Sequence, residues 1–132
     1  MTDKLTRDEL RKTMRECAVP IFPNQSAKAR LIAARLFLKY GIVSFLCGER
    51  QAITTRLTPF CRFHRLDLTN ERLASEQLAD FVDESEDCLF FLLPLTERDR
   101  LFVTAHAPLL ESRLIITDAK SLLGRTPFAC CH

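Results

Sequence analysis

The segment from Ala27 to Gly48 constrains the fold most, because a single glycine joins a long helical pattern to a buried strand pattern. Apolar residues in Ala27–Tyr40 recur at helical spacing over more than one face, which predicts a largely buried helix. Gly41 suits the left-handed position beyond a helix end. The nearly continuous apolar run Ile42–Cys47 then predicts a buried strand. A helix that leads into a buried strand is a unit of an α/β protein.

Further helix and strand patterns follow in alternation. Phe63–Leu68 predicts a strand, and Thr69 or Asn70 caps the helix after it. Cys88–Leu93 is apolar on both alternating faces, as in a central strand covered by helices on both sides. The next helix is capped by Thr96, with Asp99 as a capping acid, and ends at Pro108. A strand over Arg113–Thr117 and a last short helix from Asp118 to Gly124 complete the series.

Two segments are harder to assign. Ala18–Phe22 is in the place of the central first strand, yet Pro20 lacks the amide hydrogen that a central strand donates, so the strand could instead be short and start at Ile21. Residues 49–61 favour neither helix nor strand consistently, and Pro59 breaks either, so they stay unassigned.

Strands that alternate with long helices predict parallel βαβ units, because a parallel neighbour needs a crossover connection. Right-handed crossovers make the doubly wound order the natural arrangement. We expect residues 1–132 to form a single three-layer, Rossmann-like α/β domain with a mainly parallel sheet of four to five strands. An extra N-terminal helix over residues 7–17, which a capping box at Thr6 and Glu9 introduces, and a C-terminal tail over about residues 125–132 flank it.

Charge and composition predict a cytoplasmic domain without nucleic-acid or membrane partners. The net charge is only +2, and basic and acidic residues are mixed along the chain. No apolar run approaches the length of a membrane span, and the N-terminal residues lack the apolar segment of a secretory signal. Four of the six cysteines lie in or beside apolar runs, which favours reduced core residues: Cys17, Cys47, Cys61 and Cys88.

The order of these elements resembles the nucleotide-binding domains of Rossmann type, including the small regulatory domains of potassium transport and the domain that precedes the ATP-grasp fold in ligases. The resemblance rests on the helix into Gly41, on Ile42–Gly48, on the acid-ended strand Leu66–Thr69 and on Cys88–Leu93, within residues 18–118. It implies a nucleotide ligand. The glycine-rich phosphate loop of such domains is absent, because residues 23–26 read Pro-Asn-Gln-Ser.

Ligands of open α/β sheets bind beyond the carboxyl ends of the strands, which nominates six residues. Free amides near Ser26 would hold an anion, and Glu49 is placed to meet a neutral polar group of the ligand. Each residue also has an ordinary structural explanation, namely a helix cap or an acid in a surface turn. The candidate ligand-binding residues are Asn24, Gln25, Ser26, Glu49, Asp67 and Thr96.

No motif for acyl transfer, phosphoryl transfer or metal hydrolysis is present, so we assign no catalytic residue, no metal ligand and no cofactor. His64 and His106 are interpreted as structural, and Cys130, Cys131 and His132 as a disordered tail. The first functional hypothesis is non-catalytic binding or regulation of a nucleotide or other small anionic metabolite. The alternative is a structural or protein-interaction module with a degenerate pocket, acting as a homodimer or with a separately encoded partner. Thiol or metal chemistry ranks third.

Overall fold

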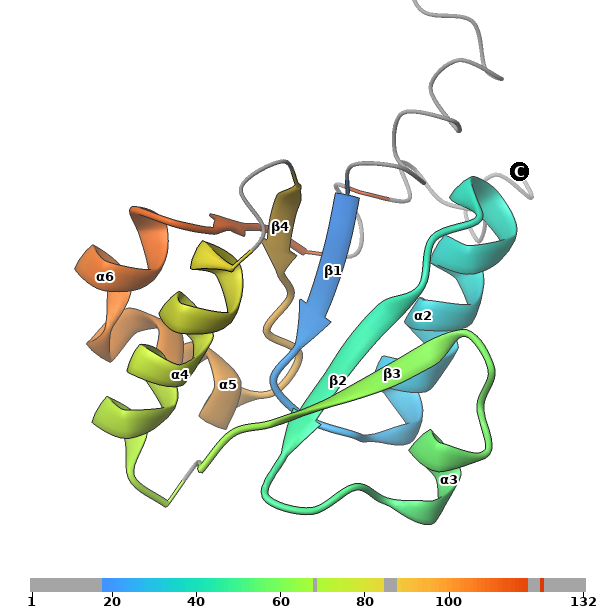
Figure 1. The fold of residues 1–132 in the computed structure, drawn as a ribbon, viewed down its shortest axis with the longest axis horizontal. Helices are drawn as coiled ribbons and strands as arrows, with labels where there is room; N and C mark the ends of the chain where they lie inside the picture. Colours follow the sequence, from blue (N-terminus) through green and yellow to red (C-terminus); the bar gives the residue numbers. More distant parts are fainter. Residues whose placement is uncertain (1–17, 68, 85–87, 119–121, 123–132) are drawn as a thin grey trace, which may run out of the picture.

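The computed structural model describes residues 18–67, 69–84, 88–118 and 122, and these contain one sheet of five parallel strands. The strand order is β3-β2-β1-β4-β5, with β1 in the centre (Figure 1). The strands are β1 (Ala18–Phe22), β2 (Ser44–Gly48), β3 (Cys61–Arg65), β4 (Leu89–Leu92) and β5 (Ile115–Ile116).

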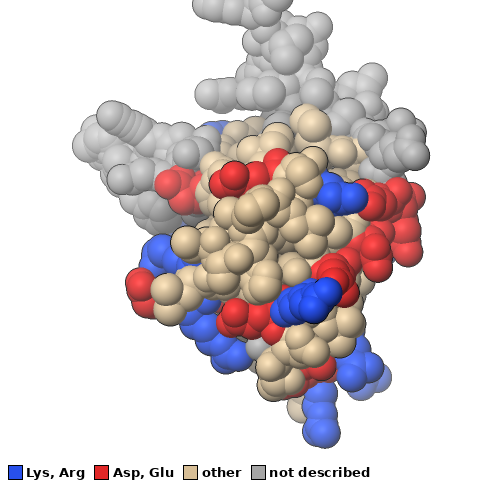
Figure 2. All heavy atoms as spheres, turned by 90° about the vertical axis from the view of Figure 1, so that its left-hand side faces the viewer, with Lys and Arg blue, Asp and Glu red and all other residues tan. Residues whose placement is uncertain are grey.

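Helices cover both faces of the sheet and complete the three layers (Figure 1). On one face lie α2 (Ala27–Tyr40) and α3 (Ile53–Arg56); on the other lie α4 (Glu71–Asp83), α5 (Glu97–Ala105) and α6 (Ala107–Glu111). Figure 2 looks onto the outer side of the second group. The expected three-layer α/β fold with a parallel sheet is therefore confirmed. None of the helices in the described ranges is long and apolar enough to cross a membrane.

β1 is the central strand despite Pro20, and its hydrogen-bond register explains how. Residues 18–21 of β1 pair with residues 89–92 of β4. The pairing of β1 with β2 begins only at Ile21. The Ile21 carbonyl accepts from the Leu93 amide, so the backbone of Ile21 faces β4 and that of Pro20 faces β2. Pro20 therefore lies before the β2 ladder starts, where no amide hydrogen is needed.

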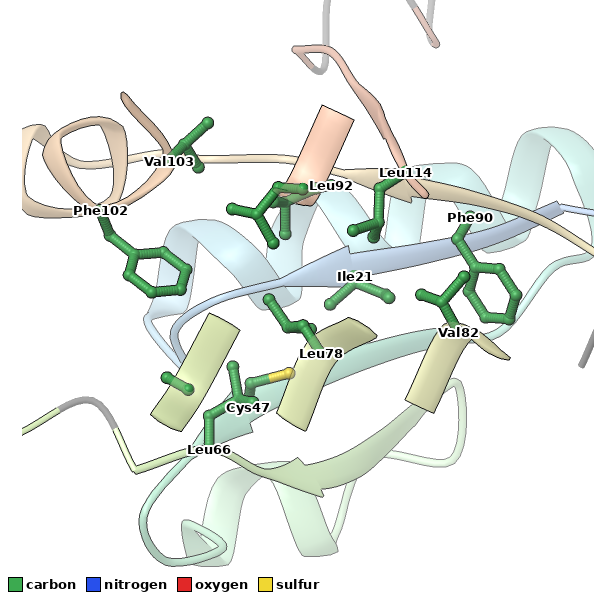
Figure 3. Packing of buried hydrophobic residues seen from close by; sticks show 12 residues of the cluster. Ile21, Cys47, Leu66, Leu78, Val82, Phe90, Leu92, Phe102, Val103 and Leu114 are labelled. Carbon is green, nitrogen blue, oxygen red and sulfur yellow. The ribbon is translucent and has the colours of Figure 1, made fainter. Parts of the chain in front are cut away.

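Two hydrophobic cores lie on the two faces of the sheet. The core under α4, α5 and α6 contains Ile21 and Cys47 from the sheet and Leu78 from α4, whose side chains point into the same space in Figure 3. The core under α2 contains Phe22, Leu46 and most of the inner face of α2. Because adjacent residues of one strand enter opposite cores, the sheet is buried on both faces, as a parallel sheet requires.

Several boundaries differ from the sequence-based expectation. β3 begins at Cys61, two residues before the expected strand, and residues 49–61 contain the short helix α3. Pro108 does not close a helix but lies in the first turn of α6. Backbone amides in a first turn have no acceptor within the helix, so the amide hydrogen that proline lacks is not needed there. The helix expected over residues 7–17, most of that expected after Asp118 and the tail over residues 125–132 lie outside the described residues.

Candidate ligand site at the carboxyl edge of the sheet

All six candidate residues lie at the carboxyl edge of the sheet, where the chain leaves a strand. Residues 24–26 form the connection from β1 to α2, and Glu49 directly follows β2. Asp67 follows β3, and Thr96 is the N-cap of α5 beyond β4. The predicted order of strands and helices therefore brings these residues to one edge, and the contacts among them divide them into separate groups.

Asp99 joins the loops that follow β1 and β4, at the point where the strand order reverses. Its buried carboxylate accepts hydrogen bonds from the Asn24 side-chain amide and from the backbone amides of Leu95 (3.0 Å) and Thr96 (3.2 Å). Thr96 completes a capping box by accepting from the Asp99 amide (3.1 Å). Polar groups that a ligand would need at this reversal point are thus already bonded to one another.

Gln25 anchors the connection between β2 and β3. Its side-chain oxygen accepts from the Ala52 amide and from the Thr55 hydroxyl, both at 2.8 Å, and its side-chain nitrogen donates to the Arg50 carbonyl (2.7 Å). The nitrogen lies 2.6 Å from where a Cβ on Gly48 would be. Glycine at this position therefore lets the Gln25 side chain reach the loop.

Ser26 and Asp67 make local structural contacts. The Ser26 hydroxyl caps α2 by accepting from the Ala29 amide (3.1 Å), and the Ser26 amide donates to the Asn24 side chain (3.0 Å). Asp67 accepts from the amide and the hydroxyl of Thr69 in the turn before α4. These bonds agree with the ordinary capping and turn roles weighed for these residues from the sequence.

Glu49 lies in a different setting, together with two arginines. Glu49, Arg50 and Arg65 line an open depression of about 740 Å³, which we call the β2–β3 hollow. Arg65 ends β3 and is in register with Gly48 at the end of β2, so the parallel pairing itself places its side chain beside the turn that carries Glu49 and Arg50. All three residues are exposed, and the hollow is therefore charged and open to solvent.

Sequence reasoning did not single out Arg50, Arg65 or the bridging role of Asp99. Arg50 adjoins Glu49, and Arg65 lies two residues before Asp67, so both are close to nominated positions. The expected strand Phe63–Leu68 placed Arg65 inside a strand, whereas β3 ends at this residue. Asp99 was expected only as a capping acid, because nothing in the sequence pairs it with Asn24.

The described cysteines and histidines do not join the hollow. Cys47 and Cys61 are buried, free thiols, as expected of core residues; burial raises the pKa of both thiols, that of Cys61 to about 11. His64 packs on the ring of Phe81 at 4.2 Å, beneath α4. No cluster of metal-ligating side chains occurs among residues 18–118 as described, and the Cys130, Cys131 and His132 tail lies outside them.

Comparisons with known proteins identify no family and no function for this site. The chain matches no family model, and no curated protein or solved structure matches it.

Proposed function

We propose that the protein is a non-catalytic binding or regulatory domain that takes a small anionic metabolite, such as a nucleotide, in the β2–β3 hollow. The observation that carries the proposal is the presence of Arg50, Arg65 and Glu49 around one depression at the carboxyl ends of two neighbouring parallel strands. This edge is where ligands of open α/β sheets bind.

The chemistry of the three side chains supports an anion with a neutral polar part. Guanidinium groups stay protonated and bind phosphate or carboxylate through paired hydrogen bonds. The Glu49 carboxylate would accept from a ligand hydroxyl or amine. The volume of about 740 Å³ is within the usual range for small-molecule sites, roughly 300 to 1,000 Å³.

The proposal places the ligand farther from α2 than the sequence-based hypothesis did. Asn24 and Thr96 are bonded to Asp99, and Gln25 holds the loop of residues 50–55. We therefore give Gln25 a positioning role and leave direct contact to Glu49, Arg50 and Arg65.

A thermal-shift panel followed by calorimetry tests the proposal. Adenine and guanine nucleotides, dinucleotides, inorganic phosphate and dicarboxylates would be added to the native chain. A ligand at a hundredfold excess over its dissociation constant should stabilise the fold by about 2.7 kcal/mol.

The variants Arg50→Gln and Arg65→Gln should each weaken binding, whereas Arg56→Gln, at an exposed arginine of α3 outside the hollow, should not. Glu49→Gln should weaken ligands whose organic part carries a hydroxyl or amine, and should not weaken inorganic phosphate, because it removes a negative charge from the hollow. The proposal would be contradicted if no ligand of the panel raised the melting temperature, or if a ligand bound the Arg50→Gln and Arg65→Gln variants as tightly as wild type.

One observation favours the alternative, a protein-interaction module. Ile53 and Leu57, one helical turn apart at α3, have relative exposures of 73% and 75%. Two such side chains in water are more typical of a contact surface than of a ligand pocket.

A further inference from the structure

The described chain divides near residue 68 into a basic segment and an acidic segment. Residues 18–67, which form β1 to β3 with α2 and α3, contain eight lysines and arginines and two acids, a formal charge of +6. The described residues from 69 to 118, which form α4 to α6 with β4 and β5, contain four arginines and nine acids, a formal charge of −5. The net charge of +2 for the whole chain conceals this polarity.

The basic half carries an exposed surface with an aliphatic centre, formed by Arg50, Ile53, Arg56 and Leu57, which we call the α3 surface. All four side chains are exposed. The helix at their centre is tied to the rest of the domain by the Thr55 hydroxyl, which donates to Gln25, and by Arg30, which donates to the Thr54 hydroxyl (3.0 Å). Ile53 and Leu57 are therefore held in place on the surface, with Arg50 and Arg56 close to them in the sequence.

The acidic half carries a surface of the opposite kind along α4. Leu73, Glu76, Asp80 and Glu84 recur at helical spacing and are all exposed, which places one apolar and three acidic side chains on one stripe, the α4 surface. Figure 2 shows that uncharged atoms occupy the centre of this side of the molecule and that both acidic and basic side chains border them. Of the stripe's acids, Glu76 is paired with the exposed Arg72 at 3.5 Å. Leu101 on α5, at 60% exposure, adds a further aliphatic group to this half.

We propose that the α3 surface of one copy of this chain docks on the α4 surface of a second copy. The two surfaces are complementary in charge. Ile53 and Leu57 on the α3 surface and Leu73 on the α4 surface are exposed aliphatic side chains, and their burial would supply free energy that charge pairing alone does not. They lie on opposite faces of the sheet, so one molecule cannot satisfy both by itself (Figure 1). The contact is heterologous, and repeated contacts build rings or open chains.

This inference deepens the interaction alternative. The α3 surface shares Arg50 with the β2–β3 hollow, so the variants that test it leave Arg50 unchanged and ligand binding is measured separately. A membrane or a nucleic acid would also attract the basic half, but neither would use the acidic half. A second copy uses both, which is why the observations favour it.

Sedimentation velocity across a range of protein concentrations measures the association. At low salt, where the Debye length is about 30 Å, the wild-type chain should form species larger than the monomer; at about 1 M salt, where it is about 3 Å, these should dissociate. The basic-side variant Ile53→Ser with Arg56→Glu should stay monomeric at low salt. Lys28→Glu, an exposed charge reversal on α2, is its control and should associate like wild type.

Mixing two variants gives the decisive test. The acidic-side variant Glu76→Lys with Asp80→Lys should also stay monomeric alone, while a mixture with the basic-side variant should form a one-to-one dimer that does not grow, because only one intact contact remains. Circular dichroism checks that each variant is folded, and the panel of ligands applied to both variants reports on the hollow separately, since Glu49, Arg50 and Arg65 are unchanged.

Three results would overturn the inference. These are a wild-type chain that stays monomeric at low salt, a mixture that stays monomeric, and association that Lys28→Glu disrupts as strongly as the basic-side variant does. Binding of the basic half to anionic vesicles or to an RNA oligonucleotide, with no self-association, would assign the surface to another partner.

Discussion

The side-chain amide of Asn24 donates a hydrogen bond to the carboxylate of Asp99, which lies 75 residues later in the chain. This bond ties the loop after β1 to the beginning of α5, across the place where the strand order reverses. In related geometries this place is an open crevice for ligands. Here it is joined by the protein's own side chains, and three exposed charged side chains line the β2–β3 hollow beside it.

Replacing Asp99 by alanine should therefore destabilise the fold. The carboxylate satisfies three donors, two of them backbone amides, and a buried donor left without a partner costs about 1–3 kcal/mol. Urea unfolding should show a loss of at least about 2 kcal/mol with an unchanged m-value. Glu97→Ala, an exposed acid in the same turn, should change stability by less than about 0.5 kcal/mol. Equal effects of the two substitutions would argue against the bridging role.

Gly48→Ala should destabilise the fold through Gln25. The new methyl group would lie 2.6 Å from the Gln25 side-chain nitrogen and would displace the side chain from the loop of residues 50–55. The expected loss is about 1–3 kcal/mol. In a double-mutant cycle, Gln25→Ala should cost less in the Gly48→Ala background than in wild type, because the same contacts are already lost. Strict additivity of the two free-energy changes would contradict this coupling.

The two phenylalanines of β4 should differ in their contribution to stability. Phe90 is buried in the core under α4, with its ring 5.8 Å from that of Phe81, whereas Phe91 is only partly buried against the other core. Phe90→Ala should cost about 3–5 kcal/mol, the range for a fully buried aromatic residue, and Phe91→Ala less. Leu89→Ala, at an exposed position of the same strand, provides the baseline. A larger loss at Phe91 than at Phe90 would reverse the assignment of the two faces.

Stability should fall as the pH drops below about 6.5, because His64 is packed against Phe81 with its Nε2 atom buried and unpaired. Burial lowers the pKa of His64, while nearby Glu84 opposes the shift. At a pH above the pKa of His64 in the unfolded chain, the imidazole is neutral in both the folded and the unfolded state, and the free energy of unfolding is not reduced. Below it the unfolded chain binds a proton more readily, and stability is lost until the pH passes the folded pKa. The pH dependence of urea unfolding measures this loss.

His64→Phe should remove most of this slope between about pH 7 and 5.5, and His106→Gln should retain it. An unchanged slope in His64→Phe would assign the acid sensitivity to other groups.

The sequence by itself determined the class of fold. The helical pattern of Ala27–Tyr40, the glycine after it and the apolar run of β4 specify elements through local periodicity, and Thr96 with Asp99 specifies a capping box through contacts only three residues apart. These features follow from the chain's own spacing, so no distant contact is needed to predict them. The carboxyl-edge location of the six candidate residues follows from the same order.

Tertiary structure alone decided which of these residues remain available and which arginines lie beside them. Pro20 is accepted in the central strand because the β2 ladder begins one residue later, and this register is a property of two strands rather than of either one. Asn24 is joined to Asp99, and Arg65 is brought beside Glu49 and Arg50, through pairings that span many residues. The basic segment 18–67 and the acidic segment 69–118 are each continuous in the sequence, and the crossover after β3 places the helices of the second segment on the other face of the sheet. Local sequence patterns carry no record of such distant neighbours, and that is the physical reason why the fold class could be predicted and the hollow could not.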